Sequence, residues 1–216
     1  MINNEWVLKL RDRPVHIEPR VAKTRWDGLY WRFEVFDRAD CEYALVRDAD
    51  SIPSSRERDL TLEWIHSGKK IHIIRDHPNH TWPINAGMWG AQTPFPFKFE
   101  NAINQWKWKR AKCGDQHLLR RIIYRRYYRE SLIHTAYVAL KGEDVRWIDP
   151  SSDFVGRRFF DPDEPIMNAQ RLLLPRENLL YEFRLEIDFY RRKYKDKLFK
   201  LLSKTARSHS TKNPTS

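Results

Sequence analysis

Residues 43–55 read YALVRDADSIPSS, and this segment decides the fold class. The apolar run 43–46 is typical of a buried strand, and the turn-forming residues 51–55 end it. Asp48 and Asp50 are therefore expected at the carboxyl end of the strand, where open α/β sheets bind their ligands. Because side chains repeat every second residue in an extended segment, both carboxylates leave the backbone on one side and can share a cation.

The acidic pair has two interpretations. Magnesium and manganese take carboxylate oxygens as ligands and commonly bridge to substrate phosphates, so the pair fits a metal held for a diphosphate. A solvated acidic turn is the alternative, and it is the more frequent outcome for a single short motif. The spacing alone leaves both interpretations open.

The elements around this segment alternate in type. A helix is predicted over 25–37, and a second helix begins at Ser55 and stops before Gly68. A further strand is predicted over 71–74, whereas residues 75–96 read as a loop because of their prolines and glycines. The alternation of helix and strand predicts an α/β fold.

The later part of the chain continues with a predicted helix over 115–128, a strand over 134–140 and a loop over 149–165. Two short strands, 6–10 and 15–17, are predicted at the start. The clearest helix of the sequence follows the loop, because seven apolar residues recur at steps of three or four. These residues are Leu179, Phe183, Ile187, Tyr190, Tyr194, Leu198 and Leu201.

The chain of 216 residues divides into three parts on these patterns. Residues 1–175 are predicted to form the α/β domain, 176–204 a long C-terminal amphipathic helix, and 205–216 a disordered polar tail. That helix is expected to pack on the domain. Two alternatives are that it pairs with a partner helix or makes peripheral contact with an anionic membrane through its basic residues.

The composition limits the class of protein. Apolar residues make up 41% of the chain and charged residues 32%, which argues against both wholesale disorder and a membrane-spanning protein. Residues 1–5 show no signal-peptide pattern, so a cytoplasmic protein is expected. Cys41 and Cys113 are too far apart in sequence to suggest a disulfide framework or a zinc site.

The net charge of +11 favours polyanionic partners, which include nucleic acid, anionic lipid and phosphorylated substrates. Part of the excess lies in residues 120–129, where arginines alternate with tyrosines. On a helix these arginines fall on more than one face, so they are interpreted as solvated side chains and a nucleic-acid partner is not expected.

Three further sites allow both a structural and a functional interpretation. In residues 85–90, NAGMWG, two glycines let the backbone approach a ligand, or form a tight turn anchored by Trp89. Asp115 begins a predicted helix and is either a first-turn acid or an acid/base group. His77 and His80, like His134, are either metal or phosphate contacts or histidines with structural hydrogen bonds.

Several short motifs follow one another in a fixed order along the chain. These are Trp31-Arg32-Phe33, Val46-Arg47-Asp48-Ala49-Asp50-Ser51, Arg56-Glu57, Glu63-Trp64, Arg75-Asp76-His77-Pro78, His80, Gly87-Met88-Trp89-Gly90, Asp115-Gln116, His134 and Asp153-Phe154-Val155-Gly156. Taken together, these motifs resemble glycosyltransferase-like proteins of the GT-A type, the DxD-containing nucleotide-sugar transferases. The resemblance covers about residues 25–160 and implies a GT-A-like mixed sheet flanked by helices.

The resemblance implies a metal-dependent enzyme that moves a sugar from a nucleotide-sugar donor to a glycan or cell-surface polysaccharide acceptor. A divalent cation, Mn²⁺ or Mg²⁺, would be held by Asp48 and Asp50, with His134 as a further metal or diphosphate contact. Asp115 would be the catalytic or acceptor-orienting carboxylate. The donor would contact Arg47, Asp48, Arg56, Gly87, Trp89 and Gly90.

Two other functions remain open at this point. One is a non-catalytic GT-A remnant that acts as a binding or membrane-surface module, and the other is a metal-dependent phosphohydrolase. Only 47 residues precede Asp48, which is short for the nucleotide-binding half of a GT-A enzyme, so an N-terminally truncated or minimal form is expected.

Overall fold

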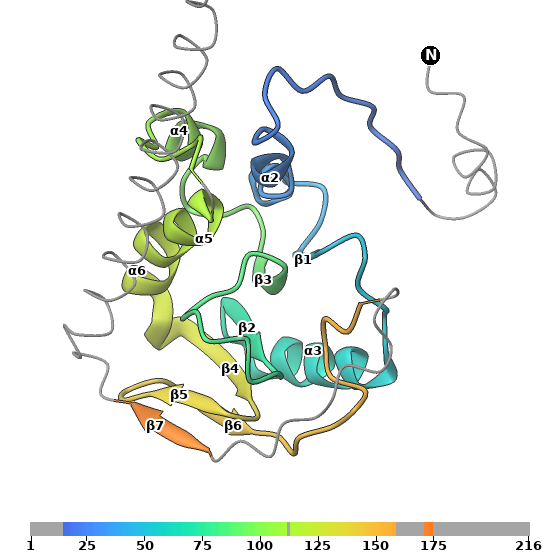
Figure 1. The fold of residues 1–216 in the computed structure, drawn as a ribbon, viewed down its shortest axis with the longest axis vertical. Helices are drawn as coiled ribbons and strands as arrows, with labels where there is room; N and C mark the ends of the chain where they lie inside the picture. The colour runs from blue at the N-terminus through green and yellow to red at the C-terminus, as the bar shows by residue number, and fades with distance from the viewer. Residues whose placement is uncertain (1–14, 112, 159–170, 175–216) are drawn as a thin grey trace, which may run out of the picture.

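The computed structural model describes residues 15–111, 113–158 and 171–174 (Figure 1). The predicted strand 6–10, the amphipathic helix 176–204 and the tail 205–216 lie outside the described residues. The predictions made for them, including the membrane contact, therefore stay predictions.

A five-stranded mixed sheet forms the centre of the described structure and confirms the prediction of an α/β fold. Its strands, in spatial order, are β1 (Tyr43–Arg47), β3 (Met88–Gln92), β2 (Ile71–Arg75), β4 (Ser131–Thr135) and β6 (Val145–Trp147). β3 runs antiparallel to both of its neighbours, while β2, β4 and β6 pair in parallel. Two short strands, β5 (Val138–Leu140) and β7 (Leu172–Leu174), form a separate parallel pair.

This topology decides which loops meet. Since β1 and β2 are both antiparallel to β3, they run in the same direction as β4 and β6. The carboxyl ends of these four strands therefore share one edge of the sheet with the amino end of β3. Residues 48–54, 76–87 and 148–158 gather at this edge.

Short helices surround the sheet. They are α2 (Gly28–Trp31), η1 (Glu34–Asp37), α3 (Ser55–Ser67), α4 (Phe99–Asn104), α5 (Gly114–Leu119), the π-helical η2 (Arg120–Tyr124), α6 (Arg125–Tyr127) and η3 (Tyr128–Glu130). The helix predicted over 115–128 is confirmed as the run from α5 to α6, with a π-helical stretch inside it. The helix predicted over 25–37 is wrong in extent, because it is divided into α2 and a 3₁₀ turn. None of the helices in the described part of the chain is long and apolar enough to cross a lipid bilayer.

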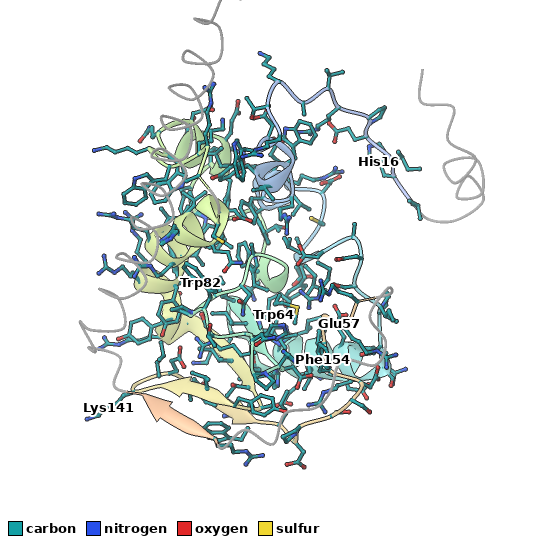
Figure 2. All side chains as sticks on the ribbon, viewed as in Figure 1. His16, Glu57, Trp64, Trp82, Lys141 and Phe154 are labelled. Carbon is teal, nitrogen blue, oxygen red and sulfur yellow. The ribbon has the colours of Figure 1, made fainter. Side chains whose placement is uncertain are left out.

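Helix α3 begins and ends as its sequence predicts. The Ser54 side chain accepts a hydrogen bond from the Glu57 amide at 3.1 Å, and Gly68 ends the helix with a left-handed φ of 68°. Trp64, which is fully buried, stacks on His72 of β2 with ring centroids 5.2 Å apart. α3 therefore covers one face of the sheet. Figure 2 labels Trp64 where α3 lies beside β2.

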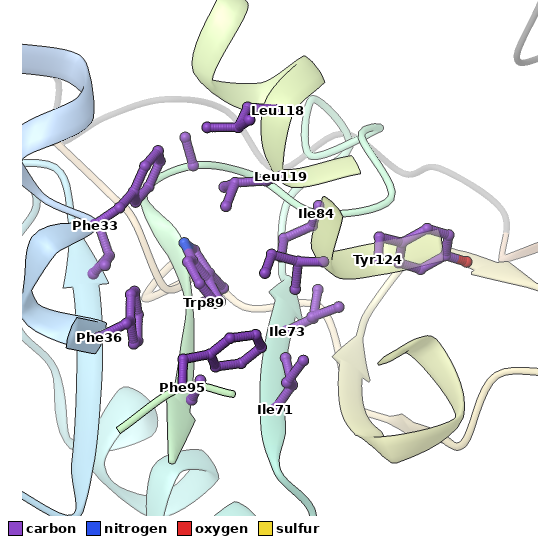
Figure 3. Packing of buried hydrophobic residues seen from close by; sticks show 14 of the residues in the cluster. Phe33, Phe36, Ile71, Ile73, Ile84, Trp89, Phe95, Leu118, Leu119 and Tyr124 are labelled. Carbon is purple, nitrogen blue, oxygen red and sulfur yellow. The ribbon is translucent and has the colours of Figure 1, made fainter. Parts of the chain in front are cut away.

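The opposite face of the sheet packs on an aromatic core. All five residues of β2 are buried because both faces of the sheet are covered there, and Ile71 and Ile73 point into this core. Its centre is Trp89 of β3, whose ring lies 4.3 Å from that of Phe36 and 6.1 Å from that of Phe33 (Figure 3). The aromatic residues near 25–37 therefore anchor this segment on the sheet.

Three further predictions of secondary structure were wrong. Residues 75–96 do not form one loop, because β3 lies within them at the second position of the sheet. Its Gly90 reads as a loop residue, yet a Cβ there would lie 2.8 Å from the Ala44 carbonyl oxygen, so the glycine permits close pairing with β1. The strand predicted over 134–140 is divided into β4 and β5, and residues 15–17 form no strand.

Candidate functional site

Two adjoining hollows open where the loops meet at the carboxyl edge of the sheet. The first, here termed the acidic cleft, has a volume of about 600 Å³, and the second, the tryptophan cleft, about 530 Å³. The acidic cleft is lined by Asp48, Ala49, Asp50, Ser51, His77, Asn79, His80, Phe154, Gly156 and Arg158. The tryptophan cleft is lined by Trp26, Leu29, Arg32, Asp48, Ser51, Asn79, His80, Trp82, Asn85, Ala86, Gly87, Met88, Cys113, Asp115, Gln116 and Gly156. Because five residues line both, the clefts are continuous, and each has the size of a small-molecule site.

Asp48 stands at the junction of the two clefts. Its carboxylate accepts a hydrogen bond from Arg32 Nη1 at 2.6 Å, while half of the side chain remains exposed. A Cβ on Gly87 would lie 2.4 Å from Asp48 Oδ2, so only glycine leaves room for this position of the carboxylate. The predicted site residues Asp48 and Gly87 are therefore in direct contact.

Asp50 follows on the tight turn after β1 and is exposed to the acidic cleft. The turn is closed by the Ser51 amide, which donates to the Asp48 carbonyl at 3.1 Å. The loop after β6 holds it from the other side, because the Ile52 amide donates to the Arg157 carbonyl at 2.8 Å. Two loops distant in sequence thus form the wall of the acidic cleft.

Asp115 lies in the first turn of α5 and is buried in the wall of the tryptophan cleft. Burial raises the pKa of its carboxyl group, because the charged form loses contact with water. The charge of Asp48 raises this pKa further, and that of Arg32 opposes both effects. Asp115 and Asp48 therefore lie close enough to interact electrostatically, although one carboxyl group is buried and the other is half-exposed.

Several polar atoms in the walls of the clefts are buried without a hydrogen-bond partner. They are His80 Nδ1, Asn85 Nδ2 and Gln116 Oε1. Burial lowers the pKa of His80 to about 3, so its ring is neutral at physiological pH. Since buried polar atoms almost always have partners, these atoms are available for hydrogen bonds with water or with a polar ligand in the clefts.

Arg56 and Asp76 frame the site without lining either cleft. The Arg56 guanidinium donates to both Asp76 oxygens, at 2.7 and 2.8 Å, and to the Asp149 carbonyl at 2.6 Å. Asp76 also accepts a hydrogen bond from the Val155 amide at 2.9 Å. This network ties together the beginning of α3 and the loops after β2 and β6, so the role shown for Arg56 is structural.

Three other predicted donor contacts lie away from the clefts. Arg47 forms an ion pair with Glu57 on the face of the sheet covered by α3, and it donates to the Trp89 carbonyl at 3.2 Å. Trp89 is part of the aromatic core, and Gly90 serves the pairing of β3 with β1. The structure does not bring their side chains to the ligand space.

The structure also separates His134 from the acidic pair. His134 faces α3, where its Nδ1 lies 2.8 Å from His72 Nε2 and its Nε2 lies 3.1 Å from Glu63 Oε2. The direction follows from strand alternation, because Ile133 before it and Thr135 after it point to the other face. The histidine that shares both clefts with Asp48 is instead His80.

Sequence reasoning assigned no site role to Arg32, Asn85 or Trp82. Arg32 is one of five charged residues in the segment 25–37, so the sequence gives no signal that singles it out. Asn85 and Trp82 lie in a stretch dense in proline and glycine, where sequence gives no direction for a side chain.

Asp48 and Asp50 both line the acidic cleft, but they lie on a tight turn and not in the extended segment from which the sequence predicted that both carboxylates leave the backbone on one side. Within the described ranges, no three His, Cys, Asp or Glu side chains are arranged to hold a metal by themselves. Magnesium is commonly held by one or two carboxylates and completes its shell with water and substrate phosphate oxygens. Asp48 and Asp50 have this chemistry for a cation that arrives with a diphosphate.

The chain was compared with protein-family models, with curated proteins and with solved structures, and no match was found.

Proposed function

We propose that the protein is a metal-dependent glycosyltransferase that moves a sugar from a nucleotide-sugar to a hydroxyl group of a glycan or polysaccharide acceptor. One observation carries this proposal. The exposed carboxylates of Asp48 and Asp50 adjoin a separate, buried carboxylate, Asp115, in one continuous pair of clefts. Carboxyl groups in contrasting environments are the usual basis for dividing electrostatic and acid/base roles within one active site.

In this proposal Asp48 and Asp50 hold Mn²⁺ or Mg²⁺ together with the donor diphosphate. When bound, the cation supplies positive charge that stabilises the departing nucleoside diphosphate. Gly87 lets the Asp48 carboxylate take its position, and Arg32 balances the charge of that carboxylate. The net charge of +11 favours an anionic donor in the same way.

Asp115 accepts the proton of the acceptor hydroxyl as that oxygen attacks the donor sugar. A raised pKa suits a general base, because catalysis is most effective when the pKa lies near the working pH. Replacement of Asp115 by Asn removes the base but keeps the size of the side chain. We expect it to lower sugar transfer by about 10²-fold or more while nucleotide binding is retained.

Calorimetric titration with uridine, guanosine and thymidine diphosphate, each with and without Mn²⁺, tests the proposal. Wild type is expected to bind one of them only with Mn²⁺, and Asp50→Ala is expected to lose this binding. Asp59→Ala is the matched control, because Asp59 is exposed on α3. If folded wild type binds none of the three, the glycosyltransferase proposal is wrong and the non-catalytic alternative is favoured.

The products distinguish transfer from hydrolysis. Release of sugar 1-phosphate or inorganic phosphate from the nucleotide-sugar, with no transfer to any glycan in a panel of acceptors, would instead support a metal-dependent phosphohydrolase. Transfer that depends on both Asp50 and Asp115 supports the proposed reaction.

A further inference from the structure

We propose that the tryptophan cleft is a binding site for a neutral sugar ring, formed by Trp26 and Trp82 together with the amides of Asn85 and Gln116. The inference rests on the proposed function and deepens it, because it assigns the carbohydrate to one of the two clefts and leaves the diphosphate and nucleoside to the other. The acidic pair defines the diphosphate position, and Asp115 defines the side on which the hydroxyl reacts.

The apolar part of the cleft is aromatic. Trp26 and Trp82 both line it and both residues are only partly buried, and the Arg25 guanidinium lies over the Trp26 ring, 4.4 Å from its centroid. Trp82 is held by an edge contact with His117, whose ring centroid lies 4.9 Å away at 87°. Flat aromatic surfaces suit the apolar C–H face of a pyranose, while hydroxyl groups at the ring edge need polar partners.

The polar part of the cleft provides such partners. Asn85 is only 8% exposed, and its Nδ2 has no hydrogen-bond partner. Gln116 Oε1 is likewise buried and unpartnered. An amide both donates and accepts, as a sugar hydroxyl does, so two amides match a ring with several hydroxyl groups. Leaving these atoms unpaired is unfavourable, and a hydroxylated ligand removes that penalty.

The charges in the cleft favour a neutral ring. The Arg32 guanidinium already pairs with Asp48, so the remaining charge on the wall is the carboxylate of Asp115. A sugar that carries a carboxylate or phosphate would meet the carboxylate of Asp115 as a like charge. A neutral hydroxylated ring meets Asp115 as a hydrogen-bond acceptor instead.

Saturation-transfer NMR tests the site with a panel of methyl glycosides of glucose, galactose, mannose and N-acetylglucosamine, and with their nucleotide-sugars. We expect saturation of sugar-ring protons on wild type, and about tenfold weaker binding for Trp82→Ala and Asn85→Ala. Trp147→Ala and Asn104→Ala are the matched controls, because Trp147 is 40% exposed on β6 and Asn104 is exposed on α4. Circular dichroism and thermal melting establish that each variant is folded, with Gln116→Ala as an independent variant if one is not.

The arms of the experiment separate the sources of the sugar. Saturation transfer to the ring protons of free methyl glycosides would assign the cleft to the acceptor sugar. Saturation transfer to sugar protons only when the sugar is part of a nucleotide-sugar would assign the cleft to the donor sugar. Either result supports a sugar site. The inference is overturned if no sugar proton is saturated, if the Trp82 and Asn85 variants bind as wild type does, or if these variants lose saturation of nucleoside protons only.

Failure of the sugar site is distinguishable from failure of the proposed function. Asp50→Ala is expected to lose nucleotide binding and to keep the binding of free glycosides, since the acidic cleft and the tryptophan cleft hold different parts of the reactants. Mn²⁺-dependent nucleotide binding by wild type with no sugar binding would leave the transferase proposal standing and overturn this inference alone.

Discussion

The Arg32 guanidinium donates to the Asp48 carboxylate at 2.6 Å and thereby occupies one side of the predicted metal-binding pair. The two residues are 16 positions apart, and the contact forms because the segment 25–37 packs against the sheet. Under the proposed function, Arg32 would therefore compete with the cation for Asp48 before the nucleotide binds.

We expect Arg32→Gln to tighten the binding of Mn²⁺ alone. Because Asp48 is half-exposed, water screens its ion pair with Arg32, and the increase in Mn²⁺ affinity is limited to about fivefold at most. Electron paramagnetic resonance of free Mn²⁺ measures this affinity. Arg38→Gln, which removes an exposed partner of Asp40, is the control and should not change the affinity. Unchanged or weaker Mn²⁺ binding by Arg32→Gln would contradict the competition.

Gly87→Ala is expected to weaken Mn²⁺-dependent nucleotide binding while the fold is kept. The new methyl group would lie 2.4 Å from Asp48 Oδ2, so the carboxylate must move away from its position. A displacement of this kind lowers binding by about tenfold or more. Calorimetry measures the effect, and Gly28→Ala is the control, because the nearest atom to its added Cβ is 4.0 Å away. Normal binding by Gly87→Ala would show that the position of Asp48 is not required.

Asp76→Ala is expected to destabilise the protein by about 3 kcal/mol, since it leaves the Arg56 guanidinium and the Val155 amide without their shared partner. The Asp76 side chain is fully buried, so water does not replace the lost contacts. Urea unfolding gives the change in free energy. Asp59→Ala, at an exposed pair, should stay within about 0.5 kcal/mol of wild type, and an equally small effect for Asp76→Ala would refute the role of this network.

His117 is expected to make the folded state sensitive to acid. Burial, aided by the charge of Arg120, lowers the pKa of His117 from 6.5 to about 4. Between these values the unfolded chain binds the proton that the folded state excludes, so stability is fully present above pH 6.5 and falls as the pH falls toward 4. The slope for one such group is at most about 1.4 kcal/mol per pH unit.

Urea unfolding of wild type and His117→Gln at pH 7.5, 5.5 and 4.5 measures this dependence. The variant should show a smaller loss of stability over this range, whereas His66→Gln, at an exposed position on α3, should follow wild type. Parallel curves for wild type and His117→Gln would exclude His117 as a source of the acid sensitivity.

Local sequence predicted the elements around the acidic pair because their signals are local. The apolar run 43–46, the helix start at Ser55, the terminal Gly68 and the strand predicted over 71–74 each depend on neighbours a few positions away. The same signals predicted that Asp48 and Asp50 follow a strand. They also predicted the wrong extent for the helix over 25–37, because an aromatic segment without proline reads as helical even where tertiary packing breaks it.

Other features depend on contacts between distant residues. β3 joins the sheet because Gly90 lets its backbone approach β1, and a glycine gives no strand signal in sequence. Side chains alternate between the two faces of β4, so a shift of one residue would turn His134 from the α3 face to the other face. The spacing of residues in the sequence therefore could not predict that His134 lies apart from Asp48 and Asp50.

The sequence by itself determined the α/β class and an acidic pair at the end of β1, because periodicity and capping act within a few residues. Only the tertiary structure decided what surrounds that pair. It brought Arg32, Gly87 and Asp115 to Asp48 from separate elements, since the order and direction of the strands decide which loops share an edge.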